Sequence, residues 1–552
     1  MPILDLACSP VKTSLLRYYW SMIGHMAAGV LLALSGAGDT PSRQAAPGPE
    51  WWREGVCYEI FVRSFQDSDG DGVGDFRGLS SRLQYLSDLG VTCLWLMPIA
   101  ESPSYHGYDV TNYYQVNRDY GSNEDFRQLM GEAHRRGIRV LVDLVLNHMS
   151  SEHPFFKSAQ LYQDSPWRDW FLWSPTQRQT TGWSVPTWHK AENRDEYYYG
   201  LFWRGMPDLN LANPAVTEEA KKVARYWLTE MDVDGFRFDA VGLFFEDGDN
   251  PRNGPGTHPW LRDYAGYIRQ LKPASFTVGE VWDSVETMRP YYPDQLDAYF
   301  AFPLADAVID AARKGSSRSL LFQLDQIQRA FPKGRYGSFL RNHDQTRTMT
   351  ELGGDWRRAR LAATLLLTLP GVPFMYYGEE IGMTGAKPDP RLRTPMHWSR
   401  QASMGFSTGV PWEPLQPDSL TANVEAQSSD PGSLLNLYRT LIRLRHSLSA
   451  LGSTGDFVPL ETGSDEVLAY LRRDGKTMAV VIANLSDRAI DGPKVSSASG
   501  TLSRGTYQVR STLGRADASG LRIRSDGGMK SWIPVVTLEP LSAVVLELVP
   551  AR

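Results

Sequence analysis

Eight short apolar runs separated by helix-like stretches constrain this chain more than any other feature of its sequence. The runs are rich in β-branched and aromatic residues and lie at 56–62, 91–97, 139–146, 235–240, 275–281, 298–303, 337–341 and 372–377. Helical patterns lie between them, at 80–89, 124–136, 214–231, 260–271, 319–330 and 356–369. Strands that alternate with helices and are apolar throughout indicate a parallel sheet buried on both faces. Eight such units predict an α/β fold, a (β/α)8 barrel of the TIM type.

Two regions depart from the barrel repeat. Residues 147–213 separate the third and fourth runs and contain six tryptophans, and so long a stretch with weak periodicity indicates a small inserted domain. After a last helical pattern at 434–448, β-rich runs lie at 466–471, 477–485, 506–513 and 535–548 and predict a C-terminal antiparallel β-sandwich. The predicted domains are the barrel at 51–146 and 214–450, the insertion at 147–213, and the β domain at 451–552.

The N-terminus resembles an export signal. Lys12 and Arg17 precede the apolar run MAAGVLLAL at 26–34, which small residues follow. This order is typical of a secretory signal peptide, and the run is too short to span a bilayer as a helix. We therefore expect a leader at 1–38, a linker at 39–50, a secreted or periplasmic protein, and no membrane span; a leader from a misassigned start is the alternative.

Charge and cysteine content exclude several classes of protein. A net charge of −6 over 552 residues offers no basic surface for phosphates, so we expect no nucleic-acid partner. Cys8, Cys57 and Cys93 cannot form a disulfide framework, match no zinc motif, and leave the compartment open. The sequence shows no Ser-His-Asp arrangement, phosphate loop or dinucleotide fingerprint, and we expect a monomer with no organic cofactor.

Carboxylic acids mark the ends of four apolar runs. Asp143, Asp239 and Glu280 lie near the ends of the third, fourth and fifth runs, and Asp344 follows the seventh. One such residue alone is usually a helix cap or a turn residue, but four strands of one barrel end at the face where barrel active sites lie. Two carboxylates suit acetal hydrolysis, one as nucleophile and one as acid and then base. Arg237 would keep Asp239 ionised, and apolar neighbours would raise the pKa of Glu280, as an acid requires.

Seven segments closely resemble the motifs of the α-amylase superfamily, glycoside hydrolase family 13. They follow the family's order from residue 51 onward and read GVTCLWLMP (90–98), DLVLNH (143–148), MPDLN (206–210), GFRFDAV (235–241), GEVW (279–282), FLRNHD (339–344) and GVPFMYYGEEIGM (371–383). The resemblance implies a retaining α-glucan enzyme with a barrel, a domain inserted after its third strand, and a C-terminal β domain.

The resemblance also implies roles for single residues. Asp239 matches the family's nucleophile, Glu280 its acid/base, and Asp344 the third acid, which grips and distorts the sugar. The residues that match its substrate-binding positions are Tyr108 in HGYD (106–109), Asp143, His148, Arg237, His343 and Arg393 in RTPMHW (393–398). Tyr108 would stack on the cleaved sugar, with simple core packing as the alternative.

An acidic, glycine-rich loop follows the first run. Asp67, Asp69, Asp71 and Asp75 would repel one another unless a hard cation were bound. Gly78 stands where the final Glu of an EF-hand belongs, so a calcium sensor is not expected. We predict a structural Ca²⁺ (or Mg²⁺) ion held by these four residues and Val73, as in many relatives of this family; a solvated acidic turn is the alternative.

The motifs also bear on linkage specificity. Ala240 resembles family members that act on α-1,4 bonds, and MPDLN resembles α-amylases intermediate between oligo-1,6-glucosidases and neopullulanases. The hypothesis is an α-amylase that cleaves α-1,4-glucosidic bonds in starch or maltooligosaccharides with retention. The RTPMHW segment keeps an exo-acting α-glucosidase or a trehalose synthase (a transglycosylase) as the alternative. Against exo-action, Tyr105 stands where strict glucosidases carry the Asp that opens an Asp-Asn-Gly-Tyr-Asp segment. A non-catalytic sugar-binding protein on the same fold is more remote, because all three acids are present.

Overall fold

The computed structural model describes residue 48 and residues 50–551, except 180–184, 193, 249 and 476. The predicted leader, most of the predicted linker and Trp183 of the insertion lie outside these residues. Within the described part of the chain, none of the helices combines the length and the apolar character needed to traverse a bilayer.

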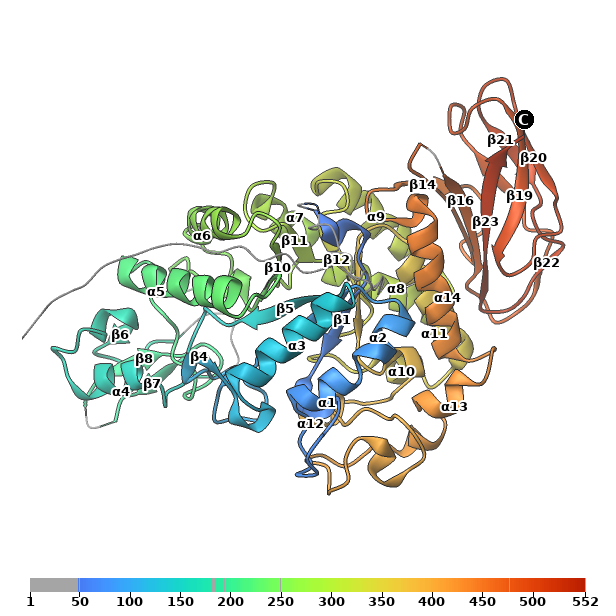
Figure 1. The fold of residues 1–552 in the computed structure, drawn as a ribbon. Helices are drawn as coiled ribbons and strands as arrows, with labels where there is room; N and C mark the ends of the chain where they lie inside the picture. Colours follow the sequence, from blue (N-terminus) through green and yellow to red (C-terminus); the bar gives the residue numbers. More distant parts are fainter. Residues whose placement is uncertain are drawn as a thin grey trace, which may run out of the picture. The chain divides into compact units, whose positions relative to one another are not determined.

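Eight parallel strands close into a barrel, as predicted (Figure 1). They are β1 (Cys57–Ile60), β2 (Cys93–Leu96), β5 (Arg139–Leu144), β9 (Gly235–Phe238), β10 (Phe276–Gly279), β11 (Ala298–Phe300), β12 (Tyr336–Ser338) and β13 (Val372–Tyr376), which closes on β1. Side chains such as Trp95, Phe300 and Phe374 fill the interior. Because the interior is packed, a ligand can bind only at the ends of the strands.

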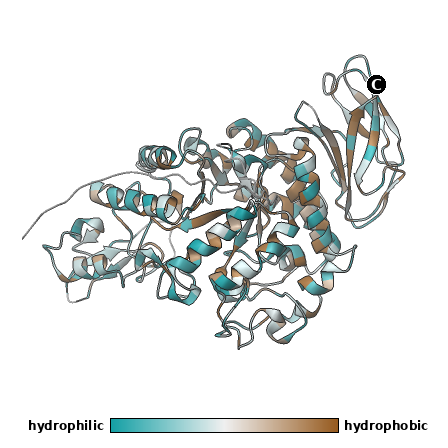
Figure 2. Cartoon of the chain, in the orientation of Figure 1, coloured by the Kyte–Doolittle hydropathy of each residue, from teal (hydrophilic) through white to brown (hydrophobic). Residues whose placement is uncertain are grey.

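Helices surround the barrel and turn one apolar face toward it. The predicted ones are α1 (Phe76–Ser81) and α2 (Leu83–Leu89), α3 (Asn123–Arg135), α5 (Pro214–Arg225) with η5 (Tyr226–Glu230), α6 (Thr257–Leu271), α9 (Arg318–Ala330), α11 (Trp356–Thr368) and α14 (Leu434–Ser447). In α3 the buried residues Phe126, Leu129, Met130 and Ala133 recur at helical spacing. Figure 2 shows that the helices around the barrel carry both hydrophilic and hydrophobic residues.

Helix α8 (Phe302–Lys314) was not predicted. It begins inside the apolar run that we read as a strand at 298–303. Eight of its side chains are buried, and these are Phe302, Leu304, Ala305, Ala307, Val308, Ile309, Ala311 and Ala312. A helix is recognised in a sequence by polar residues that recur at helical spacing along its exposed face. Because so much of α8 is buried, its start could not be distinguished from a buried strand.

The segment between β5 and β9 forms the small unit expected there. It contains α4 (Pro154–Leu161) and a three-stranded antiparallel sheet of β6 (Trp173–Ser174), β8 (Tyr197–Tyr199) and β7 (Trp188–Lys190). Several of its aromatic rings pack on one another, as Phe155 does on Trp167 with ring centroids 4.7 Å apart. The aromatic excess of this segment therefore serves partly as its own core.

A six-stranded antiparallel sheet forms the C-terminal domain, with two short ribbons against one of its faces. Its order is β14 (Asp456–Leu460), β15 (Val467–Arg473), β16 (Met478–Asn484), β23 (Ser542–Pro550), β19 (Gly505–Leu513) and β20 (Gly520–Ile523). The ribbons pair β17 (Ile490–Asp491) with β22 (Thr537–Leu538), and β18 (Val495–Ser497) with β21 (Met529–Trp532). Alternate residues of β15 pack toward the ribbons, whereas Leu468 and Tyr470 between them join the core of the barrel.

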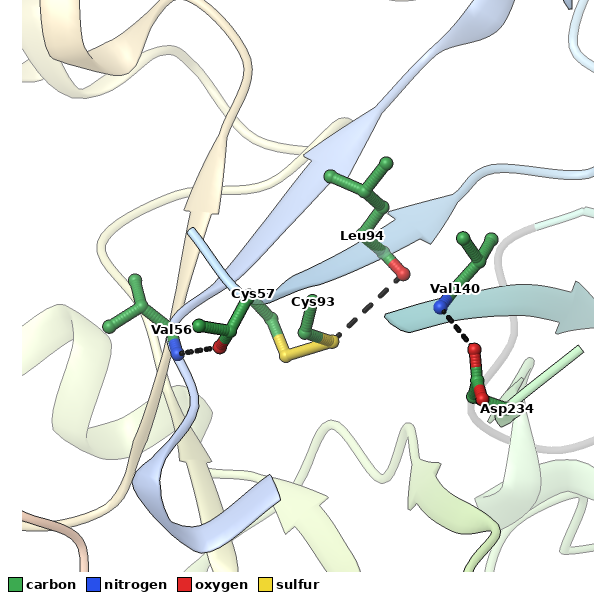
Figure 3. Close-up of a disulfide and its surroundings, with 7 residues drawn as sticks. Val56, Cys57, Cys93, Leu94, Val140 and Asp234 are labelled. Carbon is green, nitrogen blue, oxygen red and sulfur yellow. Dashed lines mark hydrogen bonds between the residues drawn. A yellow bond between two sulfur atoms is a disulfide. The ribbon is translucent and has the colours of Figure 1, made fainter. Parts of the chain in front are cut away.

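Cys57 and Cys93 form a disulfide inside the barrel (Figure 3). They open the neighbouring parallel strands β1 and β2 in register, with their Cα atoms 4.3 Å apart. By chain entropy alone, a cross-link over a separation of 36 residues stabilises a fold by about 4 kcal/mol. The cysteine count alone did not predict this pair, although each cysteine stands near the start of a predicted strand.

Candidate active site

The predicted site residues gather at the carboxyl ends of the barrel strands, around a pocket of about 800 Å³. That volume is typical of sites for small molecules. The predicted residues that line the pocket are Tyr108, His148, Asp239, Glu280, Asp344 and Arg393. The other three, Asp143, Arg237 and His343, are buried beside them and contact the lining residues from behind.

Arg237 joins three of the carboxylates. Its Nη1 donates to Asp239 Oδ1 at 2.7 Å and to both oxygens of Asp143 at 2.8 and 2.9 Å. Its Nη2 donates to Glu280 Oε2 at 2.6 Å, and its guanidinium lies over the ring of Trp95, 5.1 Å from the centroid. Because the side chain of Arg237 is 1% exposed, the guanidinium fixes the three carboxylates relative to one another.

Burial dominates the pKa values of the two principal acids. It raises the pKa of Asp239 above its ordinary value, and the positive charge of Arg237 only partly opposes that rise. We had expected Arg237 to prevail, because burial at this position cannot be seen in the sequence. Burial also raises the pKa of Glu280, which agrees with the predicted apolar setting of an acid.

Asp344 has the opposite electrostatic setting. Burial alone would raise its pKa, but His343 and Arg393 lower that pKa well below its usual range. His343 Nε2 lies 3.1 Å from Asp344 Oδ2, and Arg393 Nη2 donates to Asp344 Oδ1 at 2.9 Å. Asp344 is therefore ionised near neutral pH, beside two acids that hold their protons more tightly.

Tyr108 and His148 complete the predicted group. The hydroxyl of Tyr108 lies 2.6 Å from His343 Nε2 and donates to Asp143 Oδ2 at 3.2 Å. His148 Nε2 lies 3.1 Å from the carbonyl oxygen of Tyr108, and burial lowers the pKa of His148 to about 4, so its ring is neutral at pH 7. All nine predicted residues thus belong to one network of polar contacts.

Several lining residues were not predicted as site residues. Phe202, Trp203 and Trp282 line the pocket, and these residues are 36%, 49% and 48% exposed. Trp282 lies in the GEVW segment, and the other two precede MPDLN, so their positions next to motifs were the available signal. Exposed rings in a pocket that also holds charged residues can stack on flat ligand faces.

The acidic loop brings three of its predicted ligands together. Carboxylate oxygens of Asp67, Asp69 and Asp71 lie within 4.8 Å of one another. Burial raises the pKa of Asp71, and the negative charges of the other two add to that rise. Asp75 lies outside this group of three, since its oxygens accept bonds from Ser68 and from the backbone N–H of Gly78 at the start of α1. The group of three fits a hard cation, which oxygen ligands and negative charge favour.

Comparisons with known proteins agree with this geometry. The family described as "Alpha amylase, catalytic domain" matches residues 59–453. "Alpha-amylase 3" of Dictyoglomus thermophilum is 39% identical over 79% of this chain and 85% of its own length. "Trehalose synthase/amylase TreS" of Mycobacterium tuberculosis is 34% identical over 82% of this chain and 84% of its own. The crystal structure of an alpha-amylase from H. orenii, 38% identical, superposes with a TM-score of 0.78 over 90% of this chain and 99% of that one.

Proposed function

Since the chain belongs to the α-amylase family of glycoside hydrolases, we propose that it cleaves α-1,4-glucosidic bonds in starch or maltooligosaccharides with retention of configuration. The observation that carries this proposal is the meeting of Asp239, Glu280 and Asp344 at one pocket. Arg237 binds two of these acids and holds their carboxylates at the reacting centre.

The reaction would proceed by double displacement. A carboxylate oxygen of Asp239 attacks the anomeric carbon while Glu280 gives its proton to the glycosidic oxygen, so the bond to the leaving sugar breaks as a covalent glycosyl-enzyme forms. Glu280, now ionised, removes a proton from water, which attacks the same carbon and releases Asp239. Two inversions give retention, and Asp344, whose lowered pKa favours its ionised form, would bind sugar hydroxyls beside the reacting carbon.

Endo-action is proposed on two observations. Tyr105 stands where strict glucosidases carry an acidic residue, and the rings of Phe202, Trp203 and Trp282 line the pocket, where they could stack on further sugars of a chain. A second candidate is an exo-acting α-glucosidase or a transglycosylase. Two observations favour it: the relative named trehalose synthase/amylase, and the buried Arg393 of the RTPMHW segment.

The products formed from maltoheptaose and from maltose test this proposal. We expect mixed oligosaccharides from maltoheptaose, with α-anomers formed first. Glucose released stepwise would replace the proposal with exo-action, and trehalose formed from maltose would replace it with isomerisation. If neither sugar reacted while other α-glucosides did, the assigned linkage would be wrong.

We propose Ca²⁺ as the ion of the acidic loop, held by Asp67, Asp69 and Asp71; of the predicted set, Asp75 lies outside this group. Its role would be structural, because the loop follows β1 outside the pocket. Chelation with EDTA should lower the melting temperature by several degrees, since an ion at a hundred times its Kd stabilises the folded state by about 2.7 kcal/mol. In an Asp69→Ala variant we expect a lower melting temperature and no response to EDTA. A wild-type melting curve indifferent to EDTA would contradict the site.

Export is proposed on the signal-like leader and on the disulfide between Cys57 and Cys93, which oxidising compartments permit. When the full chain is expressed in a bacterial host, we expect the enzyme in the periplasm or the medium, with its N-terminus cut near Ala37. An unprocessed chain that stays in the cytosol would contradict the proposal. Mass spectrometry of the recovered protein makes this measurement and also detects the disulfide.

A further inference from the structure

Glu59 is a buried carboxylate that the mechanism above does not use. It lies on β1 and is 2% exposed, in a strand that is otherwise apolar apart from the hydroxyl of Tyr58. Since side chains alternate along a strand, Glu59 points to the same side as Cys57, which is the interior of the barrel. There its Oε1 contacts Nδ1 of His343.

The imidazole of His343 therefore has a carboxylate at each ring nitrogen. Glu59 lies at Nδ1, and Asp344 Oδ2 lies 3.1 Å from Nε2, where the Tyr108 hydroxyl also approaches to 2.6 Å. A neutral imidazole carries one N–H, whereas an imidazolium carries two. Glu59 accepts at Nδ1, and the Tyr108 hydroxyl, whose own proton goes to Asp143, accepts at Nε2 beside Asp344. Both ring nitrogens then carry a hydrogen, as only the imidazolium allows.

The two carboxylates outweigh burial and favour the charged form of this imidazole. Burial by itself would lower the pKa of His343, but Asp344 and Glu59 outweigh burial and raise that pKa to about 9. The titratable and charged groups that face His343, Glu59 or their direct partners are Tyr108, Asp143 from β5, Arg237 from β9, Asp344, Tyr376 from β13, and Arg393, whose Nε donates to the His343 carbonyl oxygen at 3.1 Å.

We propose that Glu59 is a positioning residue that holds His343 as an imidazolium, with Nε2 directed toward Asp344 and Tyr108. Glu59 touches no substrate and acts only through His343. The inference rests on the proposed function, because Asp344 and Tyr108 line the pocket in which the sugar would be distorted and cleaved. Without Glu59, a neutral ring would have a single N–H, and either its orientation or its charge beside Asp344 would be lost.

Two substitutions separate orientation from charge. In Glu59→Gln, an amide oxygen can still accept from Nδ1, so orientation is kept and only the charge is lost. In Glu59→Leu, both are lost. Glu380→Gln is the matched control, because Glu380 is also fully buried but binds the hydroxyls of Tyr58 and Tyr85 instead of His343.

The measurements are the ¹⁵N NMR titration of His343, assigned with a His343→Asn variant, and kinetics with maltoheptaose across pH. We expect the His343 midpoint to fall by about 1–3 pH units in Glu59→Gln, the scale on which an opposite charge acts. We expect Glu59→Leu to lose up to about 100-fold in kcat with little change in KM, the scale of a small misplacement at a reacting centre. Glu59→Gln should recover most of this loss at acidic pH and fall behind as pH rises, and the control should behave as wild type.

An unchanged His343 midpoint in Glu59→Gln overturns the inference, as does a full kcat in a folded Glu59→Leu variant. If Glu59→Leu does not fold, the comparison of Glu59→Gln with wild type decides. A difference in kcat that grows with rising pH supports the inference, and a difference that does not grow overturns it. If the wild-type enzyme does not act on maltoheptaose, the proposed function fails instead, and the titration, which needs no substrate, decides about Glu59.

Discussion

Asp239→Asn should abolish turnover while leaving sugar binding intact. The amide is nearly isosteric with the carboxylate and its oxygen can still accept from Arg237 Nη1, so the pocket should keep its shape. An amide oxygen is too weak a nucleophile to form the glycosyl-enzyme, and without that intermediate the reaction loses its covalent route. We expect kcat for maltoheptaose to fall by about 10⁴ or more, a loss typical of removing a catalytic nucleophile.

Turnover and binding must be measured on the same preparation of Asp239→Asn. Calorimetric titration of Asp239→Asn should use a maltooligosaccharide that the wild type cleaves only slowly. We expect the Kd of the variant to lie within severalfold of the wild-type Kd for the same sugar. The matched control is Asp263→Asn on α6, where the same chemical change removes an exposed ion pair with Lys221 and should leave kcat unchanged. If Asp239→Asn retained more than a hundredth of the wild-type rate, another residue would be the nucleophile.

The barrel could be predicted because each of its strands has a recognisable local sequence pattern. A parallel strand buried on both faces must be apolar along its whole length, and the turn residues on either side separate it from the next helix. The polar residues that interrupt these runs, such as Asp239 and Glu280, were the reason that a site could be predicted at all. Their burial and shared contact with Arg237 confirm that they meet, because strands of one barrel end at one face.

The features that escaped prediction depend on how distant segments are brought together in the folded barrel. Glu59 and His343 are far apart in the chain, and β1 and β12 are not adjacent, so no local pattern joins them. The pairing of Cys57 with Cys93 needs the register of β1 against β2, which an apolar run does not reveal. The raised pKa of Asp239 likewise depends on burial, which only the assembled fold determines.

Glu280→Gln should show which bond-breaking step needs a proton. The amide cannot protonate the glycosidic oxygen, so we expect kcat/KM for maltoheptaose to fall by about 10²–10⁴. With α-maltosyl fluoride, whose leaving group departs without a proton, the first step should remain fast. The second step also lacks its base, so the variant should release a burst of about one equivalent of fluoride per enzyme and then turn over slowly.

The pH dependence gives the same assignment an independent test. In the wild type, burial raises the pKa of Glu280, so its acid form persists to higher pH than that of an exposed glutamic acid, and kcat/KM falls as pH rises through that pKa. Glutamine has no proton to lose, so the decline through the pKa of Glu280 should be absent from the variant. The acidic decline caused by protonation of Asp239, and any decline as His343 loses its proton near pH 9, should remain. Equal loss of rate with maltoheptaose and with the fluoride, or an alkaline decline unchanged in the variant, would show that Glu280 is not the acid. Because the fluoride bypasses only the acid step, a slow reaction with maltoheptaose beside a fast burst isolates proton transfer from any general damage to the pocket.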